Sequence, residues 1–281
     1  MIKAILLGFV QGLTEFLPVS SSGHLVFAKE LLGVPQPGIV WAVCLHVATA
    51  AATIAVFWRD IGELLRGFGR GAVFIVERGS IAEACAREPL FKLALLYLVA
   101  IIPVGLAGFF LKDTLDKMFD DALLAGAALG ITGTVLWLTR TRPDPESGRP
   151  VGFSRAIIMG VAQAVALIPG ISRSGATISS GILSGVKAGE AARFSFLMAV
   201  PPILGAALLK AKDIRHTAMQ SSTEFVSVAA GFIVAAVVGY FALRWLLGIV
   251  QRGKLYRFAY YCWALGAAVV IWKGLQLLTA T

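Results

Sequence analysis

Long apolar runs dominate the chain, and six of them approach the length of a membrane-spanning helix. They cover residues of about 39–58, 90–111, 120–139, 192–210, 225–247 and 257–275. A helix needs about 20 apolar residues to cross the hydrocarbon core of a bilayer. The pattern therefore predicts six transmembrane helices joined by more polar connections.

Two further apolar regions are interrupted by polar residues and predict helical hairpins. The expected pairs of short helices cover residues 2–17 with 24–32, and 153–168 with 176–185. Proline lacks a backbone donor and serine and glycine favour turns, so we expect an irregular turn between the helices of each pair. A helix over residues 2–17 would be only about 24 Å long. Each pair is therefore predicted to be re-entrant, with its broken backbone shielded by protein or a watery cavity.

The second hairpin repeats the first. A shift of 152 residues, without a gap, places Gly8 on Gly160, Gln11 on Gln163, Ser20 on Ser172, Ser22 on Ser174 and Gly23 on Gly175. Each half then consists of a hairpin and three spans. Because three is odd, the two halves should have opposite orientations in the membrane, which is an inverted repeat.

The predicted fold is thus an all-α polytopic membrane protein with six spans and two re-entrant hairpins. The first repeat covers residues 1–139 with its hairpin at 2–34, a cytoplasmic linker covers 140–152, and the second repeat covers 153–281 with its hairpin at 153–186. Together the repeats are expected to form a single integral membrane domain.

Composition and charge agree with this class and suggest an orientation. The chain is 58% hydrophobic and only 15% charged, which excludes an ordinary soluble domain. Its net charge of +9 fits anionic lipid and positive cytoplasmic loops, and requires no nucleic acid. Fourteen Lys and Arg residues fall in connections on one predicted side and eight on the other. The richer side should be cytoplasmic, so both termini and the first hairpin should face outward.

The break in the first hairpin carries several reactive side chains. Gln11 and Glu15 are four residues apart and would share one helix face, and Ser20, Ser21, Ser22 and His24 follow. A carboxylate at membrane depth costs about 2.5–3.5 kcal/mol, which indicates a functional site. The alternative is a polar hairpin lying at the lipid headgroups.

The break in the second hairpin has a different chemistry. Leu167 stands where the first repeat has Glu15, Arg173 where it has Ser21, and Ala176 where it has His24. A permanently charged guanidinium among hydroxyls and the amides of a helix start is suited to phosphate, and we expect such a site from Ser172, Arg173, Ser174 and Thr177. Alternatively, Arg173 forms a salt bridge with Glu15 that only joins the hairpins. The two interpretations are compatible if Arg173 binds Glu15 in the empty site and the phosphate when substrate is bound.

Several roles stay open for these groups. With a phosphate or diphosphate substrate, Arg173 would neutralise developing charge, and either Ser21 or His24 could be the nucleophile. Glu15 could be a base or, with Gln11, hold a divalent cation shared with the diphosphate. A second intramembrane histidine, His46, is interpreted as hydrogen-bonded to a neighbouring helix.

Two motifs in this sequence resemble those of a known family. They are Gln11-x-x-x-Glu15-Phe-Leu-Pro-Val-Ser-Ser-Ser-Gly-His24 and Pro169-Gly-Ile-Ser-Arg173-Ser-Gly-Ala-Thr177, and they are similar to the motifs of the bacterial undecaprenyl-diphosphatases of the BacA type, associated with bacitracin resistance. Length and span pattern agree over essentially the whole chain. By motif position, the resemblance implies a site of Gln11, Glu15, Ser21, His24 and Arg173. Many relatives carry Glu at position 11, so Gln11 is less suited to act as a base or strong metal ligand.

The resemblance also implies an activity and a location. The reaction would convert undecaprenyl diphosphate to undecaprenyl phosphate and inorganic phosphate, with a divalent cation (Mg²⁺ or Ca²⁺), and would recycle the carrier lipid of cell-wall synthesis. The enzyme would lie in the bacterial cytoplasmic membrane with its site opening to the periplasmic face.

The main alternative is a polyprenyl-phosphate transporter or flippase, because inverted repeats with paired hairpins also occur in transporters. Glu15, Ser21 and His24 exceed what anion binding requires, which favours the hydrolase. The sequence leaves open the nucleophile, the cation, the polyprenyl length, whether the product is flipped, and whether the chain forms a homodimer.

Overall fold

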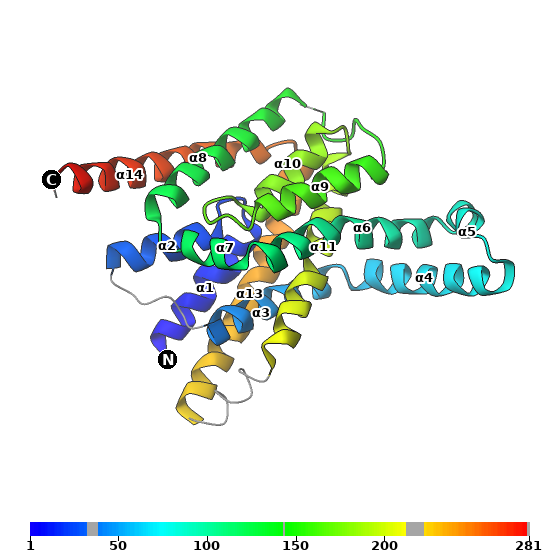
Figure 1. Ribbon diagram of the computed structural model, residues 1–281, viewed down its shortest axis with the longest axis horizontal. Helices are drawn as coiled ribbons and strands as arrows, with labels where there is room; N and C mark the ends of the chain where they lie inside the picture. Colours follow the sequence, from blue (N-terminus) through cyan, green and yellow to red (C-terminus); the bar gives the residue numbers. More distant parts are fainter. Residues whose placement is uncertain (33–38, 143, 212–221, 280–281) are drawn as a thin grey trace.

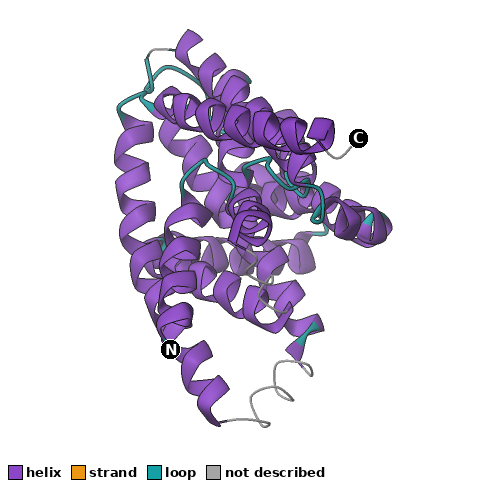
Figure 2. Cartoon of the chain, turned by 90° about the vertical axis from the view of Figure 1, so that its left-hand side faces the viewer, coloured by secondary structure: helices purple, strands orange, loops and turns teal. Residues whose placement is uncertain are grey.

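A computed structural model describes residues 1–32, 39–142, 144–211 and 222–279. Figure 2 shows helices joined by loops, and the extended pairing within these residues is one isolated bridge between Arg149 and Val186. The described helices long and apolar enough to cross a membrane are α6 (Pro89–Phe110), α8 (Ala122–Leu138) together with η1 (Thr139–Thr141), α11 (Ala188–Leu209), α13 (Ser222–Gln251) and α14 (Phe258–Thr279). The predicted all-α polytopic membrane class is confirmed.

The remaining predicted span, at about 39–58, is part of a bent pair of helices. Helix α3 (Ile39–Val56) is followed after one residue by α4 (Trp58–Arg78), and the two are bent by 80°. Helices α4, α5 (Ile81–Arg87) and α6 project together in Figure 1. A Cβ at Gly67 would lie 2.4 Å from the Cβ of Leu90, so α4 packs closely on the start of α6. Outside the two hairpins, the other described elements are the short helices α7 (Lys112–Met118) and η2 (Leu255–Arg257).

Both hairpins are present as pairs of helices, but their second helices begin earlier than predicted. The pairs are α1 (Ile2–Phe16) with α2 (Ser21–Leu32), and α9 (Phe153–Val165) with α10 (Arg173–Leu183). The serine hydroxyls of Ser20 and Ser172 accept hydrogen bonds from the backbone nitrogens of Gly23 (3.2 Å) and Gly175 (3.1 Å). Serine favours turns and helix N-caps alike. The expectation of an irregular turn through residues 21–23 is therefore wrong, because these residues form the first turn of α2.

The two breaks contact each other. A Cβ at Gly23 would lie 3.3 Å from the Cα of Gly170, and one at Gly175 would lie 3.3 Å from the Cβ of Pro18. The shift of 152 residues relates Gly23 to Gly175 and Pro18 to Gly170, so the two contacts are equivalent. The N-termini of α2 and α10 consequently lie at one place in the fold.

The first helices of the hairpins also make equivalent crossings. A Cβ at Gly8 in α1 would lie 2.3 Å from the carbonyl oxygen of Gly231 in α13, and one at Gly160 in α9 would lie 2.3 Å from that of Ala100 in α6. Small residues allow such close helix packing in membranes. The inverted orientation of the two halves, their re-entrant insertion and the repeat boundaries stay predictions. The predicted end of the first hairpin, at residues 33–34, lies outside the described residues.

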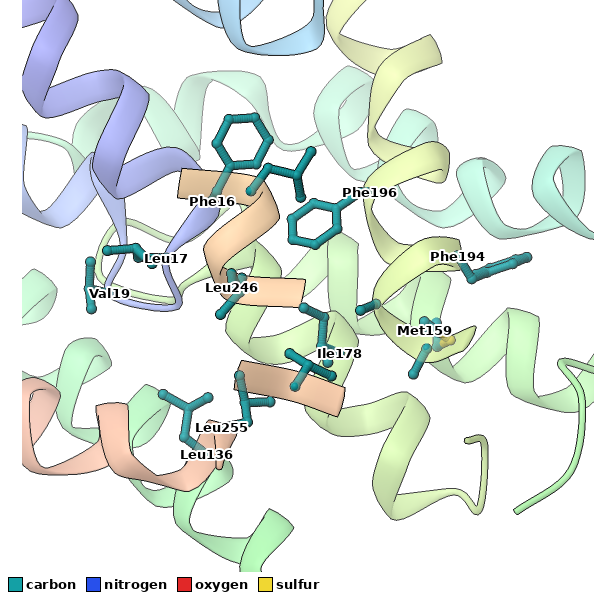
Figure 3. Packing of buried hydrophobic residues seen from close by; sticks show 14 of the residues in the cluster. Phe16, Leu17, Val19, Leu136, Met159, Ile178, Phe194, Phe196, Leu246 and Leu255 are labelled. Atoms are coloured by element: carbon teal, nitrogen blue, oxygen red, sulfur yellow. The ribbon is translucent and has the colours of Figure 1, made fainter. Parts of the chain in front are cut away.

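The core packs between the hairpins and α11. In Figure 3, Phe16 of α1 faces Phe196 of α11, and their ring centroids are 5.8 Å apart. Met159 and Ile178, from the second hairpin, are fully buried in the same cluster. On the outer helices, large apolar side chains are exposed instead of buried. Phe109 is 79% and Leu209 is 86% exposed, as expected for side chains that face lipid.

Candidate functional site

Glu15 is the centre of a polar cluster that joins both hairpins. Its Oε1 accepts a hydrogen bond from Arg173 Nη2 at 2.5 Å, and its Oε2 accepts one from Gln11 Nε2 and one from Ser21 Oγ, each at 2.9 Å. Gln11 and Glu15 come from the last turns of α1, Ser21 opens α2 and Arg173 opens α10. The structure therefore brings together four of the five residues expected from the motifs, around the carboxylate of Glu15, whose side chain is only 6% exposed.

A fourth partner of the carboxylate, His46, was not assigned to the site by the sequence. His46 Nε2 lies 3.6 Å from Glu15 Oε2, and Nδ1 lies 2.7 Å from the carbonyl oxygen of Ala42. Because a carbonyl only accepts, Nδ1 carries the proton, and Nε2 presents a lone pair or, after protonation, a positive charge to Glu15. The hydrogen bond of His46 is thus to its own helix, α3, and its contact with a neighbouring helix is the one with Glu15 of α1. The signal that could have found it is an ionisable residue inside an apolar span.

The cluster borders a cavity of about 390 Å³. This volume lies within the range of about 300–1,000 Å³ that is usual for small-molecule sites. Its polar lining comes from Thr14, Glu15, Ser20, Ser21, Ser22, His46, Gln163, Ser172 and Arg173. Its apolar lining includes side chains of α3, α6 and α11 and of the segment that follows α9. The cavity thus joins a charged end to an apolar wall.

His24 lies beside this cavity and is not among the residues that line it. Its Nδ1 is 2.8 Å from the carbonyl oxygen of Ser20, and its Nε2 is 2.7 Å from the hydroxyl of Tyr261 in α14. The carbonyl requires the proton on Nδ1, so Nε2 of the neutral ring accepts a hydrogen bond from the hydroxyl of Tyr261. Both nitrogens are therefore engaged away from Glu15, and the role of His24 as a nucleophile stays a prediction.

The predicted phosphate-binding hydroxyls divide into two groups. Ser20, Ser22 and Ser172 line the cavity, whereas Ser174 and Thr177 do not. Ser174 Oγ is 3.3 Å from Ser172 Oγ, and the hydroxyl of Thr177 donates to the carbonyl oxygen of Arg173 at 2.7 Å. Among described residues other than glycine, Ser20 alone has a positive φ, at 64°. That conformation costs about 1–3 kcal/mol and is typical of functional sites.

The donor set suits a divalent cation only if the substrate supplies most of the ligands. No group of three or more His, Cys, Asp or Glu side chains that could hold a metal is found within the described ranges. Gln11 directs its amide nitrogen, a donor, at Glu15. Mg²⁺ and Ca²⁺ prefer oxygen ligands, and Mg²⁺ is usually bound by one or two carboxylates together with substrate phosphates. Glu15 fits that arrangement, and Gln11 fits a role in positioning it.

Comparison with known proteins gives a consistent result. Residues 4–268 match the family model described as "Bacitracin resistance protein BacA". An undecaprenyl-diphosphatase of Desulfosudis oleivorans is 45% identical over 98% of this chain and 99% of its own. Proteins of that name from Desulfatibacillum aliphaticivorans (40% identical, covering 96% and 98% of the two chains) and Bacteroides fragilis (37%, covering 98% of each) are also similar. With its two hairpin breaks meeting at Glu15 and a family match over nearly its whole length, the chain belongs to the bacitracin resistance protein BacA family.

Proposed function

We propose that the protein is an integral membrane phosphatase that hydrolyses undecaprenyl diphosphate to undecaprenyl phosphate and inorganic phosphate. The observation that carries this proposal is the shared carboxylate: Ser21 Oγ and Arg173 Nη2 both contact Glu15 inside the cavity. A hydroxyl that donates a hydrogen bond to a buried carboxylate has the arrangement of a nucleophile beside its general base. A guanidinium at the same point can bind the phosphate that the hydroxyl attacks.

The residues can perform the transfer in two steps, through a phosphoserine at Ser21. Arg173 exchanges Glu15 for oxygens of the terminal phosphate, and Glu15 then accepts the Ser21 proton as Ser21 Oγ bonds to the terminal phosphorus. The bond from that phosphorus to the bridging oxygen breaks, and undecaprenyl phosphate leaves with the electron pair. Water next attacks the phosphorus of the phosphoserine and the bond from phosphorus to Ser21 Oγ breaks. Ser21 Oγ takes back the proton held by Glu15, and inorganic phosphate leaves with the protons of the water. His46 Nε2, 3.6 Å from Glu15, can share the proton held by the carboxylate.

The electrostatics of the cavity support a diphosphate. The N-termini of α2 and α10 meet at the breaks, and helix N-termini carry partial positive charge. Arg173 adds a full charge, and its side chain is 22% exposed. A bound Mg²⁺ or Ca²⁺, held by Glu15 together with diphosphate oxygens, would neutralise further negative charge.

The lipid substrate also fits a cavity with one polar end and one apolar wall. The diphosphate can reach Ser21 and Arg173 while the polyprenyl tail stays among apolar groups and lipid. We place the protein in the bacterial cytoplasmic membrane with the cavity opening to the periplasmic face, where it would recycle the carrier lipid of cell-wall synthesis and confer bacitracin resistance. The names of the relatives favour hydrolysis over the flippase alternative. A homodimer stays a prediction.

The test is phosphate release from undecaprenyl diphosphate by purified protein in detergent. Wild type, Ser21→Ala and His24→Ala would be compared with and without a chelator. We expect release by wild type, its loss in Ser21→Ala, and retention in His24→Ala. No release by folded wild type with any divalent cation would refute the hydrolase. Loss in His24→Ala with retention in Ser21→Ala would instead make His24 the nucleophile.

A further inference from the structure

A buried glutamine in the cavity has no use in the mechanism above. Gln163 of α9 lines the cavity, is only 3% exposed, and neither Nε2 nor Oε1 has a hydrogen-bond partner among the described residues. Leaving a buried polar group unpaired costs free energy, so the few that occur need a reason. An amide that faces a ligand cavity suggests that the ligand supplies the partner.

Comparison of the two repeats indicates what that partner is. Gln163 corresponds to Gln11, whose Nε2 donates to the carboxylate of Glu15 one turn further along α1. The equivalent of Glu15 is Leu167, which also lines the cavity. Gln163 therefore occupies the position of a carboxylate-binding amide in a repeat that lacks the carboxylate. An anionic oxygen of a bound ligand would complete the arrangement.

Gln163 enters the cavity from a different element than Ser21 and Arg173. Gly160, three residues earlier in α9, packs against Ala100 of α6, and both Gln163 and Val104, about one turn further along each helix, line the cavity. The lining also includes Phe119, Ala166 and Leu167. Gln163 thus comes from within α9, close to its crossing with α6, whereas Ser21 and Arg173, which would hold the transferred phosphate, open α2 and α10.

We propose that Gln163 is a substrate-binding residue whose Nε2 donates a hydrogen bond to the phosphate that stays on the polyprenyl chain. This inference rests on the proposed function for the identity of the ligand. It assigns the two ends of the diphosphate to different hairpins: the terminal phosphate to Arg173 and Ser21, and the lipid-linked phosphate to Gln163. The apolar wall beside Gln163 then receives the first isoprenyl units.

The variant that tests this is Gln163→Met, which keeps length and approximate volume but removes the amide. Binding of labelled undecaprenyl phosphate would be measured by scintillation proximity, together with competition by inorganic phosphate. Hydrogen bonds to charged groups are strong enough that we expect affinity for undecaprenyl phosphate to fall about tenfold or more, with affinity for inorganic phosphate unchanged. In Gln163→Glu, a carboxylate facing the phosphate should weaken lipid binding further.

A matched control is Ser179→Ala. Ser179 of α10 is also buried with an unpartnered hydroxyl but is not among the residues lining the cavity, so its removal should leave both affinities unchanged. Thermal unfolding of Gln163→Met should match wild type or rise, because no internal hydrogen bond is lost. Unchanged affinity for undecaprenyl phosphate in both Gln163 variants would overturn the proposal, as would an equal loss for inorganic phosphate. Binding needs no turnover, so failure of hydrolysis in wild type would refute the proposed function separately.

Discussion

The Glu15–Arg173 pair allows the catalytic and the purely structural interpretation of Arg173 to be separated. If the salt bridge only joins the hairpins, replacing both charges with neutral side chains should leave a working protein. If the pair is the site, such a protein should fold and still be inactive. The double variant Glu15→Gln/Arg173→Met, with its two single variants, tests this directly.

The structure sets the magnitude for stability. Removing one partner of a buried ion pair costs about 3–5 kcal/mol, because the other charge is left uncompensated. The side chain of Arg173 is 22% exposed and that of Glu15 is 6% exposed, so water would partly solvate Arg173 alone. We expect a loss of about 2–3 kcal/mol in Glu15→Gln. At about 2–4 °C per kcal/mol, its melting temperature should fall by about 4–12 °C.

The double variant should regain much of this loss. No charge is then left unpaired, so the double variant should be at least about 2 kcal/mol more stable than the sum of the single losses predicts. Its phosphate release should nevertheless stay below about a hundredth of that of wild type, because general-base catalysis contributes about 10²–10⁴-fold. Melting in detergent and phosphate release from undecaprenyl diphosphate measure the two quantities on the same samples.

Recovery of both stability and activity in the double variant would refute the reasoning. It would mean that neither Glu15 nor Arg173 touches the reacting groups. Additive losses of stability in the double variant would refute the expected coupling between Glu15 and Arg173, because they would show that the two side chains do not interact in the protein.

Three further predictions follow from the same contacts. Ser21→Ala should lower phosphate release by at least about a hundredfold, whereas Ser22→Ala, without a bond to Glu15, should lower it less than about tenfold, as steady-state rates will show. His46→Ala should lower kcat by about tenfold, equivalent to 1.4 kcal/mol, and an unchanged kcat would remove His46 from the site. Gly160→Ala should cost about 1–3 kcal/mol in thermal unfolding because its Cβ would lie 2.3 Å from a backbone oxygen, whereas Gly105→Ala, with nothing within 4 Å, should not destabilise.

Much of the architecture could be predicted from the sequence because bilayer thickness and hydropathy fix the spans. Five predicted spans correspond to α6, α8, α11, α13 and α14 within a few residues. The convergence of Glu15 with Arg173 could also be anticipated, because the internal repeat implies that the two breaks meet. The starts of α2 and α10 could not, since serine and glycine favour both turns and helix N-termini, and only hydrogen bonds distinguish the two.

The contacts between distant elements could not be predicted from the sequence for a different reason. His46 and Tyr261 are single polar residues in apolar spans, and hydropathy does not determine which way a helix is rotated about its axis. Helix rotation turns His46 toward Glu15 and brings Tyr261 to His24. The 80° bend between α3 and α4 lies at the predicted end of the span, but hydropathy gives no information about the angle between the two helices.

The two repeats share a backbone frame but differ in charge, and the difference itself explains how the site can work. The serine caps and the glycine contacts of the two breaks are equivalent. If both repeats carried the same charged residue at equivalent positions, the two like charges would therefore face each other at the place where the breaks meet. Two arginines would repel each other without ligand, and two glutamates would repel a phosphate. One glutamate facing one arginine is stable when the site is empty. When phosphate takes the arginine, the same exchange frees the carboxylate that Ser21 needs as its base.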